Sequence, residues 1–292
     1  MNKKRILIFG FGYTASFLAN ILNQKGWSVF ATGREKGKLA IIKRKDAEPI
    51  LFSDEKKIEK IFNEELYILN SIPPDSGEDP LLRKYSRIIW EKKEFVKWVG
   101  YYSTTSVYGD NSGDWVTEKT IPKPKLTRSK TRLKIEKFWQ DLGKENNIPI
   151  NIFRLSGIYG PGRSLIDRLR LGENIVVVNR PNQLFNRVHV EDIANVTYLA
   201  MRKRINNDIF NVTDDLPASQ VDVADMATKL LNLPPVKKVS LESDLISDMA
   251  RSFYLEEKKV SNKKIKTKLG YRFKFPSFDV GLKDLLIKTT KV

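Results

Sequence analysis

Short apolar runs alternate with segments of helical periodicity along the first half of the chain. The runs that we interpret as strands lie at residues 5–10, 28–32, 48–52, 65–74, 97–106 and 149–160. A further helical pattern opens close to residue 126, and the others cover residues 13–25, 35–45, 54–62 and 79–90. Strands that alternate with helices in this way predict a parallel sheet with helices on both faces.

The pattern changes after Gly160, where glycine, proline and short mixed segments become frequent. We expect a short strand at 208–214, and helices after Glu191 and at 221–233, 243–253 and 279–289. The whole pattern predicts an α/β protein with a doubly wound parallel sheet in residues 1–160. Residues 161–292 are expected to form a smaller, mixed C-terminal lobe that is interleaved with the last strands of the sheet.

The residue types present exclude several kinds of catalytic and metal-binding site. The chain of 292 residues has no cysteine and one histidine, His189, which excludes disulfides, thiolate nucleophiles and histidine metal clusters. No aspartate-rich motif supports a carboxylate-only Mg²⁺ site, so we predict no metal. The basic and apolar start is like that of a signal peptide but breaks at a Gly-x-Gly, which favours a first strand and a cytoplasmic protein. No apolar run reaches the roughly 18 residues of a membrane span.

The net charge of +17 is a strong compositional bias. Such a charge is typical of nucleic-acid-binding proteins, and a nucleic-acid-associated protein is one hypothesis. The lysines, however, are spread over the whole chain, and no helix-turn-helix, ribonucleoprotein or zinc-finger signature is present. We therefore interpret the charge as general bias, which still favours anionic ligands.

The first predicted strand runs into a turn typical of dinucleotide-binding proteins. It reads Gly10-x-Gly12-x-x-Ala15 and opens the first helix of a strand–helix–strand unit, which is the context that this short motif requires. In such a Rossmann turn, Gly10 allows the tight turn, Gly12 lets a pyrophosphate approach the backbone, and Ala15 keeps the helix close to the strand. The N–H groups at the helix start then face the phosphates, so Tyr13 and Thr14 are further candidate cofactor contacts.

Cofactor preference is expected at the end of the second strand, about 20 residues after the glycine turn. An aspartate there accepts hydrogen bonds from the ribose hydroxyls of NAD, but this chain has Thr32, Gly33 and Arg34. An arginine fits a 2′-phosphate. We therefore predict NADP as the cofactor, with NAD as the alternative; a merely solvated Arg34 is the other interpretation.

Four later segments occur in a recognisable order: YYSTTSVYGD (101–110), FRLSGIYGPGR (153–163), NRVHVEDIA (186–194) and FNVTDD (210–215). Together they resemble the extended short-chain dehydrogenases/reductases, in the branch of NAD-dependent epimerases and dehydratases that act on nucleotide sugars. The resemblance implies a Rossmann-type fold and a nicotinamide cofactor. By position it also implies more cofactor contacts, namely Ser71, Ile72, Pro73, Ser103, Leu155 and Ile158.

Thr104 lies where the resemblance implies a catalytic serine or threonine whose hydroxyl bonds the reacting oxygen. The simpler interpretation is a strand-end threonine that bonds the backbone, and both can hold. Thr105 and Ser106 stand where sugar-nucleotide 4,6-dehydratases carry an Asp-Glu pair. Because these hydroxyls have no comparable titratable proton, dehydration is disfavoured.

The main departure from the family lies in the segment LTRSKTRLKIE (126–136). The family carries Tyr-x-x-x-Lys on this helix, and the register set by Glu136 places Arg128 at the tyrosine and Arg132 at the lysine. A guanidinium cannot move the proton that the phenol moves, but it can hold an oxyanion or ribose hydroxyls. The alternative for Arg132 is a surface pair with Glu136, and a second register, anchored on Ser129-Lys130, gives no tyrosine either.

Further residues are assigned by the same resemblance. Tyr108 is a candidate proton donor or a wall of the substrate pocket, and Trp115 is either a lid over the substrate or a buried loop tryptophan. Arg163 and Arg187 are candidate contacts to an anionic substrate. His189 is interpreted as structural, Tyr159 as structural or as a liner of the pocket, and Asp192 as the cap of the helix that follows.

The resulting hypothesis is an NADP-binding, epimerase-like or reductase-like enzyme for a small, anionic or nucleotide-linked sugar-type substrate. Arg128, Arg132, Thr104 and Tyr108 are its candidate catalytic residues. The first alternative is a non-catalytic NADP-binding sensor or scaffold. The sequence leaves the substrate, the reaction direction and the oligomeric state open, and it is compatible with a homodimer.

Overall fold

The computed structural model describes residues 3–289. Within that part of the chain, a seven-stranded sheet has the order β11-β7-β5-β4-β1-β2-β3. In this order the strands are β11 (Asp208–Val212), β7 (Ile150–Leu155), β5 (Val96–Thr104), β4 (Leu66–Asn70), β1 (Arg5–Phe9), β2 (Ser28–Gly33) and β3 (Glu48–Leu51). β1 pairs in parallel with β2 and β4, and β2–β3 and β4–β5 are parallel as well. The predicted Rossmann-type α/β fold is confirmed.

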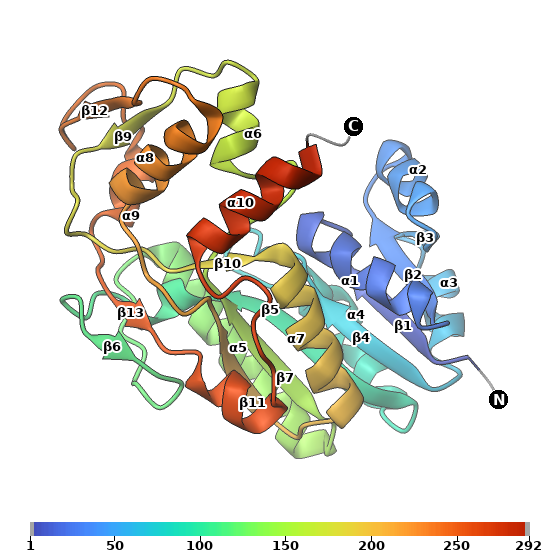
Figure 1. Ribbon diagram of the computed structural model, residues 1–292. Helices are drawn as coiled ribbons and strands as arrows, with labels where there is room; N and C mark the ends of the chain where they lie inside the picture. The colour runs from blue at the N-terminus through green and yellow to red at the C-terminus, as the bar shows by residue number, and fades with distance from the viewer. Residues whose placement is uncertain (1–2, 290–292) are drawn as a thin grey trace. The chain divides into compact units, whose positions relative to one another are not determined.

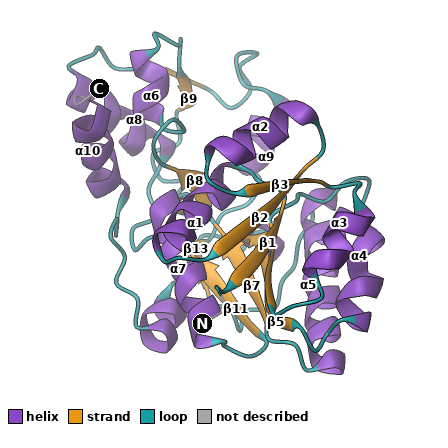
Figure 2. Cartoon of the chain, turned by 90° about the vertical axis from the view of Figure 1, so that its right-hand side faces the viewer, coloured by secondary structure: helices purple, strands orange, loops and turns teal. Residues whose placement is uncertain are grey.

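Helices cover both faces of this sheet. They are α1 (Tyr13–Gln24), α2 (Lys36–Arg44), α3 (Glu55–Ile61), α4 (Pro80–Glu91), α5 (Thr127–Asn146) and α7 (Val190–Lys203). The view in Figure 2 shows α3, α4 and α5 on one side of the strands and α1 and α7 on the other. None of the described helices is long and apolar enough to cross a membrane.

Strand alternation explains how the core forms. Leu7 and Phe9 of β1 point into a buried cluster with α3, α4 and α5, whereas Ile6 and Ile8, also fully buried, point to the opposite face. Asp79 starts α4 by accepting hydrogen bonds from the backbone N–H groups of Leu81 and Leu82. Its other oxygen accepts from the Trp139 indole of α5 at 3.1 Å, so the buried carboxylate also joins the two helices.

The chain divides into two compact units. Unit 1 comprises Met1–Val107, Lys125–Arg154 and Ile193–Phe210, and unit 2 comprises Tyr108–Pro124, Leu155–Asp192 and Asn211–Val292. Unit 1 therefore holds the glycine turn, the end of β4 and α5. Unit 2 holds Tyr108, Trp115, Arg163 and Arg187.

Unit 2 is built from short elements (Figure 1). Its parallel strand pairs are β8 (Gly157–Tyr159) with β10 (Arg187–His189), β9 (Val176–Val178) with β12 (Lys237–Val239), and β6 (Trp115–Val116) with β13 (Lys259–Val260). Its other elements are α6 (Leu165–Arg170), α8 (Gln220–Leu231), α9 (Asp248–Phe253), a π-helical turn (Ile265–Leu269) and α10 (Phe278–Thr289). Ile166, Val223 and Leu282 bring α6, α8 and α10 together in one buried cluster.

Several predicted bounds differ from the structure, such as the strand expected at 65–74, which ends at Asn70, and two differences are larger. The strand expected at 149–160 is two strands, because Gly157 N–H donates to Asn186 O and starts a separate pair with β10. Of the helix expected at 243–253, only α9 forms; Ser247 caps it by accepting from Ala250 N–H at 3.2 Å. Both errors arise where a contact distant in sequence, or a local cap, interrupts a continuous pattern.

Candidate functional site

The glycine turn lies between the ends of β2 and β4. Gly10 has φ +83°, and a Cβ placed on it would lie 2.8 Å from Ile72 Cγ1 and 3.0 Å from Ile72 N, so only glycine fits. Gly10 N–H donates to Thr32 Oγ1 at 3.1 Å. Three segments that the sequence nominated separately, those of Gly10, Thr32 and Ile72, are therefore in contact.

Gly12 differs from Gly10 because it faces open space. Its φ of −90° is ordinary, it precedes α1, and no described side chain caps the helix. A Cβ on Gly12 would meet no atom within 4 Å. The first N–H groups of a helix have no acceptor within that helix, so this turn offers donors and room to an anion such as a pyrophosphate.

The remaining cofactor candidates in unit 1 vary in exposure. Thr14 and Ala15 are buried, while Tyr13 is half-buried and contacts Phe17 edge to face, with ring centroids 5.2 Å apart. Arg34 is exposed directly after β2 and, among the described residues, has no ion-pair partner. Ser71 and Ile72 are half-buried and Pro73 is exposed.

The two arginines of α5 differ in environment. Arg128 is exposed. Arg132 is half-buried, and its Nη1 donates to Tyr101 Oη at 3.0 Å and to Tyr102 O at 2.9 Å. The guanidinium also lies over the Tyr101 ring, 5.8 Å from its centroid. The one-turn spacing is confirmed, and Arg132 lies against the sheet.

Glu136 is part of a buried ionic network rather than a surface pair. It is 1% exposed and accepts from Arg154 Nη2 at 2.6 Å and from Arg154 Nε at 3.1 and 3.2 Å. Ser103 Oγ donates to the same carboxylate at 2.5 Å. The alternative of an Arg132–Glu136 surface pair was wrong, because the helical stripe that contains Glu136 packs against β5 and β7.

A group of hydroxyls lies at the end of β5. Thr104 Oγ1 accepts from Ser106 N–H at 3.2 Å, which is the simpler of its two interpretations, and its own proton remains available for donation. Ser129 Oγ donates to Ser106 Oγ at 2.9 Å, and Ser129 is fully buried. Sequence reasoning missed Ser129; the signal was its place three residues before Arg132 on the sheet-facing stripe.

In unit 2, Tyr108 is fully buried and its hydroxyl donates to Asn211 Oδ1 at 2.7 Å. Both roles expected for Tyr108, proton donor and pocket wall, remain predictions. Trp115 is 54% exposed, and Lys259 Nζ lies 5.7 Å from the centroid of its ring. The alternative of a loop tryptophan buried in the lobe interface and the lid both remain predictions.

The guanidinium of Arg187 is engaged by unit 2 itself. It donates to the backbone oxygens of Phe185 at 3.0 Å and Ala218 at 2.7 Å. Burial lowers the pKa of Arg187 to about 10. Burial also raises the pKa of Asp214 to about 8, although the charge of Arg187 opposes this. A substrate contact of Arg187 remains a prediction, as does one of the exposed Arg163.

Two further cofactor candidates belong to unit 2. Leu155 is buried at the last position of β7, and Ile158 is half-buried in β8. Their contact with a cofactor remains a prediction.

His189 and Asp192 are held in the interior of unit 2. His189 is fully buried, with ring centroids 5.2 Å from Tyr159 and 3.7 Å from Phe275, and its Nδ1 accepts from Glu191 N–H. Asp192 lies inside the first turn of α7 and does not cap it. Its carboxylate accepts from Tyr271 Oη and from the N–H groups of Lys274 and Phe275.

One group of a histidine and two carboxylates was not predicted from the sequence. His189, Glu191 and Asp284 each place one potential ligand atom within 4.8 Å of the others. Asp284 comes from α10, far along the chain, so spacing gave no signal. Lys274 Nζ lies 2.7 Å from Glu191 Oε2 and supplies a positive charge there already. The absence of a metal requirement remains a prediction.

Comparison with known proteins settles the family. Residues 6–213 match the NAD-dependent epimerase/dehydratase family. The chain belongs to this family. The resemblance to extended short-chain dehydrogenases/reductases is thereby confirmed, and a nicotinamide dinucleotide is the cofactor type of the family. The open turn at Gly12 and the uncapped start of α1 fit the phosphates of such a group.

Solved structures resemble this member of the family over nearly its whole length. A conserved protein of unknown function from Silicibacter pomeroyi DSS is 38% identical, covers 98% of this chain and 99% of its own, and has a TM-score of 0.88. The dTDP-glucose 4,6-dehydratase of Bacillus anthracis str. Ames, in complex with NAD, is 15% identical over 99% and 97%, with a TM-score of 0.80. The UDP-glucose 4-epimerase of Thermotoga maritima, with UDP-glucose, is 23% identical over 98% and 99%, with a TM-score of 0.76. No curated protein matches this chain.

Proposed function

We propose that this protein binds NADP at the turn Gly10–Ala15 and catalyses oxidation–reduction or epimerisation of a small, anionic, sugar-type substrate. The observation that carries the proposal is the open, uncapped turn at Gly12, found in a chain of the epimerase/dehydratase family. Nucleotide-sugar epimerases among the similar structures support the substrate class.

Arg34 provides the NADP preference. It is exposed at the end of β2, next to the Thr32 that holds the glycine turn, and no described carboxylate neutralises it. A 2′-phosphate offers its guanidinium a bidentate, charge-assisted acceptor, whereas the hydroxyl of NAD does not.

Hydride transfer is what the nicotinamide supplies once bound; the protein must bind and orient the substrate and stabilise its charge. Thr104 donates its hydroxyl proton to the reacting oxygen while its Oγ1 accepts from Ser106 N–H. Arg128 holds the negative charge of the substrate through paired N–H donors. Both bonds of Arg132 come from Nη1, which leaves its Nε and Nη2 hydrogens for ribose hydroxyls.

Titration calorimetry with NADP and NAD tests the cofactor. Wild type should bind NADP about tenfold or more tightly than NAD, since a charged hydrogen bond contributes roughly that much. Arg34→Asp should lose this preference. Lys36→Asp is the matched control, because it makes the same charge change on an exposed neighbour and should retain the preference. Equal affinities of the two dinucleotides in wild type would refute the NADP assignment.

One observation favours the alternative of a sensor without turnover. The hydroxyl of Tyr108 is already donated to Asn211, and in the register that the resemblance implies, Arg128 takes the place of the family's proton-transferring tyrosine. Such a protein would bind the dinucleotide and show no change in its oxidation state with any substrate.

A further inference from the structure

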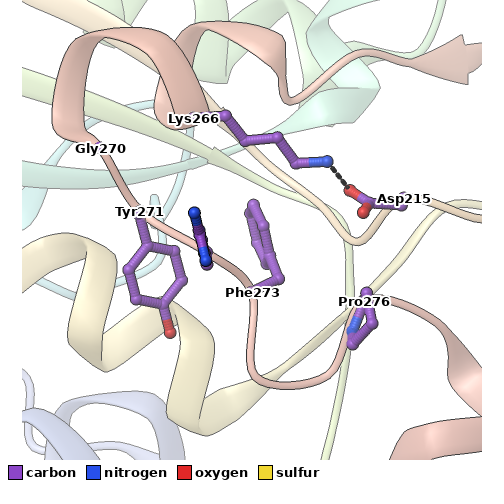
Figure 3. Close-up of a pocket in the computed structure, with 7 residues that line it drawn as sticks. Asp215, Lys266, Gly270, Tyr271, Phe273 and Pro276 are labelled. Atoms are coloured by element: carbon purple, nitrogen blue, oxygen red, sulfur yellow. Dashed lines mark ion pairs between the residues drawn. The ribbon is translucent and has the colours of Figure 1, made fainter.

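Unit 2 contains a surface pocket that is separate from the residues discussed so far as cofactor and substrate contacts. Its volume is about 550 Å³, and its lining consists of Asp215, Lys266, the segment 270–273 and Pro276. Figure 3 shows the Lys266–Asp215 ion pair on one side and the ring of Tyr271 on the other, with Phe273 between. Pockets of roughly 300–1,000 Å³ are those that hold small ligands.

The walls of this pocket are fixed by buried and backbone contacts. Gly270 has φ +65° and ends the π-helical turn, which sends the chain back along the pocket. Tyr271 Oη donates to Asp192 at 2.5 Å, and the N–H of Lys274 donates to the same carboxylate at 2.9 Å. On the opposite side, Asp215 N–H donates to Pro276 O at 2.8 Å. A ligand would therefore meet a preformed surface.

The charge of the lining is positive. Residues 258–274 contain eight lysines and arginines and no acidic residue. Lys266 lies 2.6 Å from Asp215, and Asn262 donates to the same carboxylate at 2.6 Å, so this negative charge is compensated within the pocket. Arg272 is exposed, and no carboxylate of residues 3–289 lies within ion-pair distance of it. The guanidinium of Arg272 can therefore bind an anionic ligand.

Aromatic surface accompanies this charge. The rings of Tyr271 and Phe273 meet edge to face with centroids 5.3 Å apart, and the Pro276 ring adds a further apolar surface. Flat apolar surface next to a guanidinium is suited to a ligand that carries both a ring and an anionic group.

We propose that this pocket binds a small aryl phosphate, with Arg272 on the phosphate and the ring against Tyr271 and Phe273. The lining residues all belong to unit 2, and the proposal does not depend on the proposed function. It adds a ligand site that the family match does not imply.

Calorimetry with phenyl phosphate tests the proposal, with NADP present at saturation so that the glycine turn is filled. Wild type should bind phenyl phosphate more tightly than inorganic phosphate and than cyclohexyl phosphate, which has the same charge on a puckered ring. Arg272→Ala should bind phenyl phosphate about tenfold more weakly, as expected for one charged hydrogen-bonding group.

Lys263→Ala is the matched control, because Lys263 is an exposed cation of the same basic segment and does not line the pocket. It should retain the wild-type affinity. Absence of phenyl phosphate binding, or equal affinity in wild type and Arg272→Ala, would overturn the proposal. The affinity for NADP, measured separately, should be the same in both variants and wild type, so a failure here is distinct from a failure of the proposed function.

Discussion

Glu136 and Arg154 illustrate how a charged residue in an apparently polar helix can be part of the core. Their side chains are 1% and 3% exposed, and three hydrogen bonds join them. The sequence offered Arg132 as the partner of Glu136 because the two lie one turn apart. The structure gives Glu136 a partner from β7 instead, and no pattern within α5 could have shown this.

Glu136→Gln should be strongly destabilising, because it removes the buried carboxylate charge that pairs with the guanidinium of Arg154. Loss of one partner of a buried pair costs about 3–5 kcal/mol of unfolding free energy. Urea denaturation measures this free energy. The control is Glu91→Gln, which breaks the exposed Arg87–Glu91 pair and should cause little change. Similar changes in the free energy of unfolding for the two variants would show that the buried pair stabilises the fold no more than the exposed pair.

Asp214 should make stability depend on pH. Burial raises its pKa to about 8 in the folded protein, above the value of about 3.9 in an unfolded chain. Between these values the folded state binds more protons than the unfolded state, so this group lowers the unfolding free energy as pH rises from about 4 to about 8. The lowered pKa of Arg187, about 10, acts only above this window.

Asp214→Asn should remove that contribution and make the stability profile flatter between pH 5 and 8, a window roughly inside the two pKa values. Asp79 and Asp192 also have pKa values raised by burial, and they affect both proteins alike. Thermal unfolding of wild type and variant across this range measures the difference. Parallel profiles would mean that Asp214 stays ionised in the folded protein.

Among the elements, the turn between β1 and α1 contains one glycine that the fold requires and one glycine that leaves room for a ligand. Gly10 is required by the close approach of Ile72, whereas Gly12 has open space and an ordinary φ. Sequence reasoning gave both glycines a role from the motif alone. The structure distinguishes the glycine needed for the fold from the one whose missing Cβ leaves room for a ligand.

Gly12→Ala should therefore leave the melting temperature nearly unchanged and weaken NADP binding by about tenfold or more, because the new methyl group occupies the space of the pyrophosphate. Gly37→Ala in α2, where a Cβ also meets nothing within 4 Å, is the matched control. It should change neither property. Unaltered NADP affinity in Gly12→Ala would place the dinucleotide elsewhere.

Predictability also differed between elements. The strands and helices of the sheet were predicted because each is a continuous run with a clear period, such as β1 and α4. The short pairs of unit 2 were not, since β8, β9 and β13 span two or three residues and are defined by partners distant in sequence. Asp192 was misassigned as a cap for the same reason, because its carboxylate oxygens accept hydrogen bonds from the distant segment 271–275.

For the whole molecule, the order of the motifs along the chain predicted the family, but it did not predict the contacts between side chains. The segments at 101–110, 153–163 and 186–194 implied the family, which the match over residues 6–213 confirms. They could not show that Arg132 bonds Tyr101 or that Ser129 bonds Ser106. The departure at Arg128 and Arg132, which the resemblance implies, remains a prediction.

The central property of the proposed enzyme is that it changes the oxidation state of its nicotinamide cofactor. Wild type, Arg128→Ala and the control Lys130→Ala, which removes an exposed cation of the same helix, are each mixed with NADP or NADPH and a panel of anionic nucleotide sugars and their keto forms. The absorbance of the reduced nicotinamide is followed. We predict a net or transient change in wild type and Lys130→Ala, and a rate roughly a hundredfold lower in Arg128→Ala, as for loss of an oxyanion contact. Tight NADP binding without any absorbance change in wild type would contradict the proposed catalytic function and identify a non-catalytic dinucleotide sensor.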